Sequence, residues 1–258
     1  RDDVATIAQV FQSGGYKTYM AGKWHCGGEY PPHLPQYWKK HAGDETHPLP
    51  VQRGFDEHYG TLGGGGSYYD PPSLIHNRQL ILQTPDDYYY TDAINDEACR
   101  MIQEAGAGHF FLYVAHCAPH WPLHAPEEVI AKYRGKYKNG WDELRQTRYE
   151  KLKELGLIES EWDCSPRDGH SFPWDDASHK DWEDARMATY AAMIDVMDQG
   201  IGRIVETLER KDMLDDTMII FLSDNGGCAE FLKENGDEGS WPEFYSGVSS
   251  DGTQTIVG

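Results

Sequence analysis

The chain has 258 residues, 39% of them hydrophobic and 26% charged, and its formal net charge is −20. So acidic a surface should repel nucleic-acid phosphates, and no apolar run reaches the roughly 18 residues that a membrane span needs. We therefore expect neither a nucleic-acid partner nor a membrane span, and an anionic substrate would need a locally positive pocket or a metal ion. Five scattered cysteines without a CxxC pair indicate neither a zinc module nor a disulfide framework.

The first half of the chain alternates helix and strand signals. Apolar residues at helical spacing predict a helix over residues 4–13, and a short strand begins at Tyr16 and runs into a glycine-bearing loop. Residues 31–53 are rich in Pro and His and are expected to form an excursion on the surface. A second helix is predicted over residues 91–105. The continuous apolar run at residues 109–117 that follows it is typical of a buried parallel strand.

The second half repeats the alternation after a variable region. Residues 127–182 read as loop-rich, with one helix over 141–155, and a long amphipathic helix is predicted over 187–208. An apolar strand over 217–224 then breaks at Asn-Gly-Gly. Helices that alternate with short apolar strands favour an α/β layer architecture. The glycine run at 63–66 fits no phosphate-binding pattern and predicts a flexible loop.

Polar side chains follow three of the predicted strands at their carboxyl ends, where sites form in open α/β sheets. These pairs are Lys23 with His25, His120 with His124, and Asp224 with Asn225. An Asp carboxylate and an Asn amide oxygen are hard ligands that suit Ca²⁺ or Mg²⁺, although Asp-Asn-Gly is also a common turn. Lys23 and His25 would share one face of an extended segment and could hold an oxyanion, or could be a surface lysine and a packing histidine. His120 and His124 could be zinc ligands, but a metal-free proton donor to a leaving group is at least as natural.

The combined motifs resemble the sulfatase family, within the alkaline-phosphatase-like superfamily. The segment ATIAQVFQSGGYKTYMAGKWHCGG at 5–28 resembles the family's second signature, with Cys26 at a position that is commonly Leu in relatives. Further segments resemble family blocks in the family's order, and they are RGFDEHYG at 53–60, APHWPLHAP at 118–126, YAAMIDVMDQGIGRI at 190–204 and IIFLSDNGG at 219–227. The resemblance spans nearly the whole chain and is greatest to bacterial arylsulfatases. It implies a central mixed, mostly parallel sheet flanked by helices, as part of one catalytic domain over residues 1–258 with a variable insertion at about 127–182.

The resemblance also implies a mechanism of sulfate ester hydrolysis. In such enzymes a Cys or Ser in C/S-x-P-x-R becomes formylglycine, the nucleophile, and Ca²⁺ assists it. By motif, Asp224 and Asn225 would be calcium ligands, and Lys23 would contact the sulfate. His25 would assist the formylglycine, and His120 would touch the sulfate and protonate the leaving oxygen. The implied substrate is a small-molecule or glycan sulfate ester, and the implied location is periplasmic or secreted.

One part of the family pattern is absent from residues 1–258. No C/S-x-P-x-R occurs, because the CSPR segment at Cys164 has Asp168 where the pattern requires Arg. We therefore expect an internal fragment that is inactive and poorly soluble by itself. Two alternatives stay open, namely a phosphoester or phosphonate hydrolase of the same superfamily, and a non-catalytic domain that binds anions or a partner.

Overall fold

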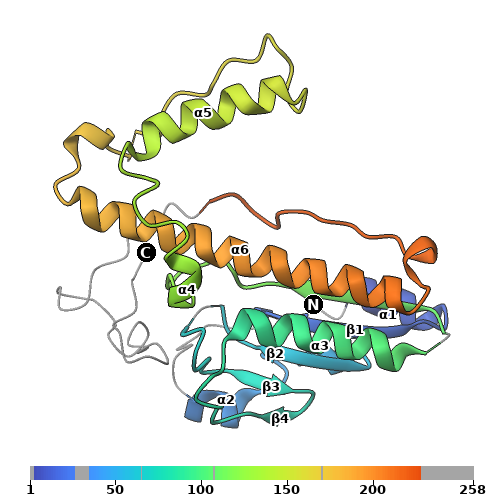
Figure 1. Ribbon diagram of the computed structural model, residues 1–258. Helices are drawn as coiled ribbons and strands as arrows, with labels where there is room; N and C mark the ends of the chain where they lie inside the picture. Colours follow the sequence, from blue (N-terminus) through green and yellow to red (C-terminus); the bar gives the residue numbers. More distant parts are fainter. Residues whose placement is uncertain (1–2, 27–34, 65, 107, 170, 228–258) are drawn as a thin grey trace. The chain divides into compact units, whose positions relative to one another are not determined.

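The computed structural model describes residues 3–26, 35–64, 66–106, 108–169 and 171–227 (Figure 1). Its elements, in chain order, are α1 (Ile7–Ser13), β1 (Lys17–Gly22), α2 (Pro35–His41), the 3-10 turn η1 (Pro50–Gln52), β2 (Glu57–Thr61), β3 (Leu74–His76), β4 (Gln79–Leu80), α3 (Tyr90–Ala105), β5 (Phe110–Ala115), α4 (Glu127–Ile130), α5 (Gly140–Glu154), η2 (Trp174–Asp176), α6 (Lys180–Arg210) and η3 (Leu214–Asp216). The chain divides into two compact units, one of residues 1–124 and 193–258 and the other of residues 125–192. No helix among the described residues is both long and apolar enough to cross a membrane.

The first unit is built on a five-stranded sheet in the order β4-β3-β2-β1-β5. Strand β1 pairs in parallel with both β2 and β5, whereas β3 and β4 extend the sheet in antiparallel pairings. The sheet is therefore mixed, as expected, with its parallel part around β1. Because β1 has neighbours on both edges, its residues from Thr18 to Gly22 are all buried.

Helices α1 and α3 cover opposite faces of β1. Met20 packs in one cluster with Ala8 of α1 and Phe55. Its neighbour Tyr19 points to the other face, where the charges of Glu104 and Arg100 on α3 act on its hydroxyl. Alternation of side chains along a strand explains this division, and it confirms an α/β arrangement with helices on both sides of the sheet.

Helix α1 begins at a capping box. The hydroxyl of Thr6 accepts from the backbone N–H of Gln9 at 3.1 Å, while the backbone N–H of Thr6 donates to the side chain of Gln9 at 2.8 Å. The predicted helices over 4–13 and 91–105 are confirmed as α1 and α3, and the buried face of α3 carries the predicted apolar residues, Ile94, Ala98, Met101 and Ile102.

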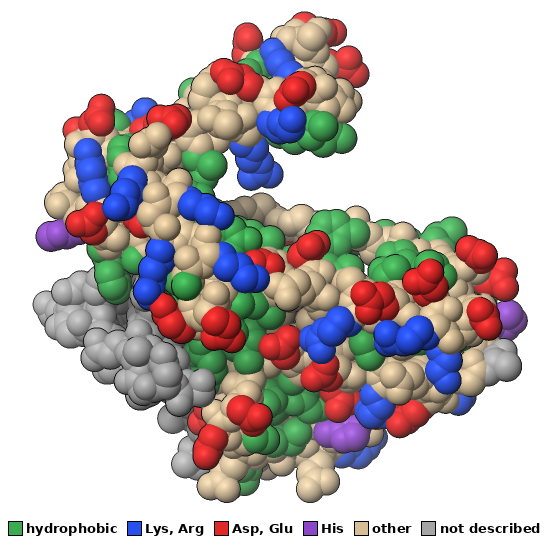
Figure 2. All heavy atoms as spheres, in the orientation of Figure 1, with side chains coloured by type: hydrophobic (Ala, Val, Ile, Leu, Met, Phe, Trp, Pro, Cys, Tyr) green, Lys and Arg blue, Asp and Glu red, His purple; other side chains and the backbone are tan. Residues whose placement is uncertain are grey.

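The part of α6 in the first unit packs along α3, as Figure 1 shows. A Cβ atom at Gly200 would lie 1.8 Å from the amide nitrogen of Asn95, so a glycine is required for this close approach. The guanidinium of Arg203 contacts Asp92 at 2.9 Å and Asp96 at 2.5 Å. Acidic and basic side chains alternate over these two helices in Figure 2. The predicted long helix is thus confirmed, and it extends from Lys180 to Arg210.

The second unit contains α4, α5, η2 and the first part of α6. The carboxylate of Asp184 accepts from the backbone N–H groups of Gly135 and Tyr137, at 2.9 and 2.8 Å. Trp174 is buried and meets Trp141 edge-on, with ring centroids 4.8 Å apart. The helix predicted over 141–155 is confirmed as α5.

One sequence prediction about local structure is wrong. Residues 217–224 do not form a strand, and the apolar side chains from Met218 to Leu222 are 52–85% exposed. An apolar run becomes a strand only where a neighbouring strand offers hydrogen bonds, and none of the described strands pairs with this segment. In the glycine run, Gly63, Gly64 and Gly66 are buried, and the flexibility of this loop stays a prediction.

Candidate active site

The loop after β1 is held by both neighbouring strands. The backbone N–H of Lys23 donates to Ala115 O of β5 at 2.9 Å, and that of Trp24 donates to Thr61 O of β2 at 2.8 Å. The Trp24 indole N–H donates to Pro48 O at 2.7 Å. Trp24 therefore anchors the loop in the protein. Lys23, which precedes it in the sequence, is half-buried, and His25, which follows it, is exposed.

His25 sits in a restricted position at the end of this loop. Its φ of 47° lies in the left-handed region that residues with a Cβ atom rarely adopt. Its imidazole lies against Gly64, where a Cβ atom would come within 2.5 Å of His25 Cε1. The buried glycine run thus leaves room for the His25 ring, a role that no phosphate-binding pattern in the sequence could have revealed.

Lys23 and His120 both act electrostatically on His25. The pKa of His25 is lowered, first by partial burial, then by the positive charge of Lys23 and by His120. These effects all disfavour the imidazolium form. That Lys23, His25 and His120 serve one site stays a prediction, which this electrostatic coupling favours.

His120 is fixed by three hydrogen bonds. Its backbone N–H donates to Cys117 O at 2.9 Å, and its carbonyl accepts from the Tyr68 hydroxyl at 2.9 Å. Its Nδ1 lies 2.7 Å from Trp121 O. Because a carbonyl oxygen can only accept, Nδ1 carries the proton in this contact, and Nε2 is the nitrogen whose protonation can change.

His124 belongs to the protein core rather than to this cluster. Its side chain is 1% exposed, and its Nδ1 accepts from the backbone N–H of Tyr68 at 3.3 Å. Burial lowers the pKa of His124 to about 3. Among the described residues, His120 and His124 share no group of three metal-ligating side chains. The zinc alternative therefore finds no support in this part of the chain.

Asp224 reaches the same edge of the sheet although its segment is not a strand. Its negative charge helps to raise the pKa of the Tyr113 hydroxyl on β5, after burial, and it also acts on the thiol of Cys117. Lys23 acts on the same thiol in the opposite direction. The charges of Asp224 and Lys23 therefore both act on Cys117, which follows the end of β5.

Asn225 follows Asp224 and has its amide oriented by a local contact. Its Nδ2 donates to Gly226 O at 2.8 Å, so its Oδ1 is the atom left to act as a ligand. A carboxylate and an amide oxygen on adjacent, exposed residues fit a hard divalent cation, although Ca²⁺ takes about six to eight oxygen ligands.

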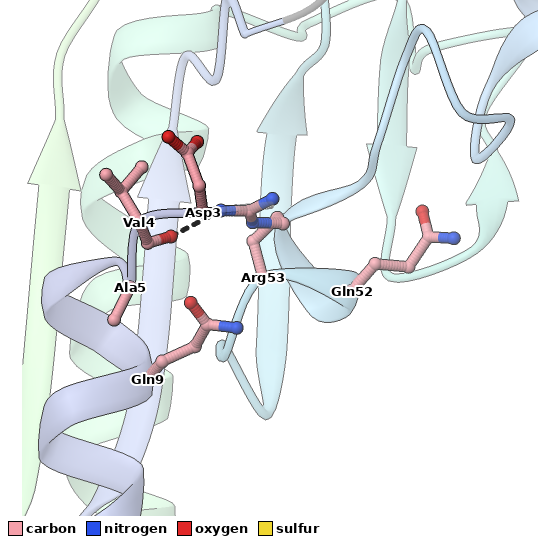
Figure 3. Close-up of a pocket in the computed structure, with 6 residues that line it drawn as sticks. All are labelled: Asp3, Val4, Ala5, Gln9, Gln52 and Arg53. Atoms are coloured by element: carbon pink, nitrogen blue, oxygen red, sulfur yellow. Dashed lines mark hydrogen bonds between the residues drawn. The ribbon is translucent and has the colours of Figure 1, made fainter. Parts of the chain in front are cut away.

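A surface hollow lies beside the start of α1 (Figure 3). It is lined by Asp3, Val4, Ala5, Gln9, Gln52 and Arg53. The guanidinium of Arg53 donates to Val4 O at 3.1 Å, which ties η1 to the start of α1. Burial raises the pKa of the Cys26 thiol, and the positive charge of Arg53 offsets part of that rise. A further positive charge therefore lies near the loop that bears Lys23.

Comparison with known proteins identifies relatives over nearly the whole chain. The family model described as Sulfatase matches residues 1–244. An uncharacterized sulfatase of Schizosaccharomyces pombe is 33% identical over 251 residues, which cover 90% of this chain and 42% of that protein. An arylsulfatase of Klebsiella aerogenes is 30% identical over 283 residues, which cover all of this chain and 55% of that protein. The chain thus spans about half the length of these relatives.

Solved structures share the fold. Ps i-CgsB has a TM-score of 0.51 at 24% identity and covers 83% of this chain and 38% of its own. The Bacteroides fragilis protein yidJ has a TM-score of 0.51 at 19% identity, over 83% of this chain and 42% of its own.

Proposed function

The chain belongs to the sulfatase family, and we propose that the intact protein is a hydrolase that cleaves sulfate esters at the sheet edge bearing Lys23, His25, His120 and Asp224. One observation carries this proposal. The charges of Lys23 and His120 act on His25, and those of Lys23 and Asp224 act on Cys117, so residues of three distant segments influence one another near the carboxyl ends of β1 and β5. Metal-assisted hydrolysis of a tetrahedral anionic ester uses such cations, a proton donor and ligands for the metal ion.

Each residue has a role that its surroundings support. The ammonium group of Lys23 binds sulfate oxygens. His25 accepts a proton near neutral pH, because its lowered pKa keeps the imidazole neutral. His120 holds one proton at Nδ1 against Trp121 O and gives the other, from Nε2, to the leaving oxygen.

We further propose a metal ion and a nucleophile, both taken from the family resemblance. Asp224 and Asn225 would hold Ca²⁺ through their side-chain oxygens, together with further ligands. When present in the intact protein, formylglycine would supply the nucleophile and Ca²⁺ would offset charge on the sulfate oxygens. Since residues 1–258 contain no C/S-x-P-x-R, we expect this polypeptide by itself to show no turnover. Clear arylsulfate hydrolysis by residues 1–258 would contradict that expectation.

The substrate class is also a proposal. One relative, 27% identical, is an N-acetylglucosamine-6-O-sulfatase of Bacteroides thetaiotaomicron. A sulfated small molecule or glycan is therefore the substrate we favour.

The test compares hydrolysis of an aryl sulfate and the matching aryl phosphate by the full-length protein. We expect the sulfate to be preferred, and Lys23→Met or His120→Gln to lower kcat/KM by about 10²–10⁴-fold. Lys17→Met, at the exposed start of the same strand, is the matched control. A preference for the phosphate would favour the phosphoester alternative, and unchanged kinetics in both site variants would overturn the proposed roles.

Removal and re-addition of Ca²⁺ tests the proposed role of Asp224 as a calcium ligand. Chelation should abolish hydrolysis, and added Ca²⁺ should restore it in the wild type. Asp224→Asn should require a higher Ca²⁺ concentration for half-maximal activity. Full activity in chelator would exclude the proposed calcium.

A further inference from the structure

A second group of metal-ligating side chains lies on the segment after α2. It consists of His41, at the end of α2, and of Asp44 and His47 in the loop that follows. One ligand atom from each lies within 4.8 Å of the others. We propose that His41, Asp44 and His47 form a binding site for a divalent transition-metal ion such as Zn²⁺, separate from the calcium site proposed above.

The spacing of the three ligands is close to what such an ion requires. His41 Nδ1 lies 2.8 Å from Asp44 Oδ2, and His47 Nδ1 lies 3.5 Å from Asp44 Oδ1. A tetrahedral Zn²⁺ with bonds of about 2.0–2.2 Å places neighbouring ligand atoms roughly 3.3–3.6 Å apart. The 3.5 Å separation falls in this range and the 2.8 Å separation is shorter, and the partial exposure of His41 and Asp44, 28% and 39%, leaves their side chains room to adjust.

The type of ligand decides the class of ion. Two imidazole nitrogens and one carboxylate suit Zn²⁺, Co²⁺ or Ni²⁺, whereas Ca²⁺ is bound by oxygen atoms. The exposed side of Asp44 leaves space for water or another ligand at the fourth position. The two proposed sites should therefore select different ions.

The surroundings of His47 orient it as a metal ligand. Its side chain is 5% exposed and packs edge-on against Trp38, with ring centroids 5.7 Å apart. The Tyr37 hydroxyl lies 3.0 Å from His47 Nε2. A ligating imidazole usually makes such a hydrogen bond through its other nitrogen, which holds the ring in place. The opposite nitrogen, Nδ1, lies 2.7 Å from Thr46 Oγ1 and 3.5 Å from Asp44 Oδ1.

The loop itself keeps Asp44 in position without a metal ion. Asp44 Oδ1 accepts from the backbone N–H groups of Thr46 and His47, both at 2.9 Å, and from the Thr46 hydroxyl at 2.8 Å. The single hydroxyl proton of Thr46 goes to Asp44, so His47 Nδ1 donates to Thr46 Oγ1 at 2.7 Å. Metal binding would require this Nδ1 to give up its proton and the Tyr37 hydroxyl to accept from Nε2 instead.

Cobalt titration of the full-length protein tests the proposal. Co²⁺ is added in the presence of excess Ca²⁺, and its visible d–d absorption reports nitrogen ligands and coordination geometry. We expect one tightly bound equivalent in the wild type. His41→Ala and Asp44→Asn should weaken binding by more than the roughly 10–100-fold that loss of an outer hydrogen-bond partner causes, and Tyr37→Phe by about that amount.

The controls make either outcome decisive. His179→Gln removes an exposed histidine in the second unit and should leave Co²⁺ affinity unchanged. Circular dichroism verifies that each variant is folded, and Zn²⁺ should raise the Tm of the wild type but not that of His41→Ala. Absence of binding in the wild type, or equal affinity in folded His41→Ala, would overturn the proposal.

Discussion

His25 combines a left-handed backbone with the electrostatic influence of two other basic groups. Its φ of 47° follows from the turn that carries the chain out of β1, and its ring is accommodated only because residue 64 is glycine. Lys23 and His120 then disfavour its protonation. At the residue scale, the site therefore depends on Gly64 as well as on the ionisable side chains.

Removing the Lys23 charge should raise the pKa of His25. Lys23→Met deletes the largest charge effect on this imidazole, so the imidazolium form becomes less unfavourable. NMR titration of the His25 Cε1 proton would measure the change. Lys17→Met should leave the His25 pKa where it is, and an unchanged value in Lys23→Met would contradict the proposed proximity of the two groups.

At the scale of elements, close contact of backbones limits what the central strands tolerate. Gly22 has a φ of 122°, and a Cβ atom there would lie 1.9 Å from Ala115 O of β5. Gly60 makes a similar contact, since its Cβ atom would lie 1.8 Å from Gly22 O. The three strands around β1 therefore meet where side chains cannot fit.

Gly22→Ala should lower the free energy of unfolding by about 2–4 kcal/mol, through backbone strain and collision with β5. Urea denaturation would measure the loss. Gly202→Ala is the control, because nothing lies within 4 Å of its added methyl group and alanine in a helix should raise stability by up to about 1 kcal/mol. Equal stabilities of the two variants would show that the contact at Gly22 is unimportant.

The segment from Met218 to Leu222 is the largest exposed apolar run in the described part of the chain. Five consecutive exposed apolar side chains favour self-association. We predict that residues 1–258 alone form oligomers and that Ile220→Asp raises the monomer fraction in light scattering after gel filtration.

Leu157→Asp is the control for Ile220→Asp. Leu157 is 66% exposed and lies in the second unit, and Ile220 is 72% exposed. Leu157→Asp adds the same charge outside the apolar run, so it should change the monomer fraction less. A monodisperse wild-type monomer would refute the prediction.

At the scale of the whole molecule, buried neutral histidines connect stability to pH. Burial lowers the pKa of His58 and of His116 to about 4, and that of His124 to about 3, from 6.5 in the unfolded chain. Below pH 6.5 the unfolded chain therefore binds more protons than the folded protein at these positions. Their contribution to stability is complete above pH 6.5 and falls as the pH drops toward about 4.

We expect the Tm to decline over this acidic window. In this window each histidine adds up to about 1.4 kcal/mol per pH unit to the slope of the free energy of unfolding against pH. His116→Gln keeps a donor for Asn95 Oδ1, which His116 Nε2 contacts at 2.8 Å. This variant should lower the slope of the unfolding free energy against pH by the contribution of one histidine. His179→Gln, at an exposed position, should leave the slope unchanged, and a pH-independent Tm from 7 to 4.5 would refute the argument.

Short-range patterns in the sequence determined a large part of this structure. Helical spacing correctly predicted α1, α3, α5 and α6. The continuous apolar run correctly predicted β5 as a parallel strand but wrongly as a buried one, since β5 lies at the edge of the described sheet and Tyr113 is 46% exposed. The same patterns missed α2 and the short strands β2 to β4. Strand β2 lacks an apolar alternation, and β3 and β4 have only three and two residues, so each depends on its neighbours in the sheet.

Only the tertiary structure decided which polar residues meet. The sequence identified Lys23, His25 and His120 because they follow strands, and parallel strands bring their carboxyl ends to one edge. It could not show that Gly64 makes room for His25, or that His124 is buried by the surrounding chain, since these depend on segments far apart in sequence. It also predicted a strand at residues 217–224 because apolar character is local, whereas a strand exists only when a partner supplies its hydrogen bonds.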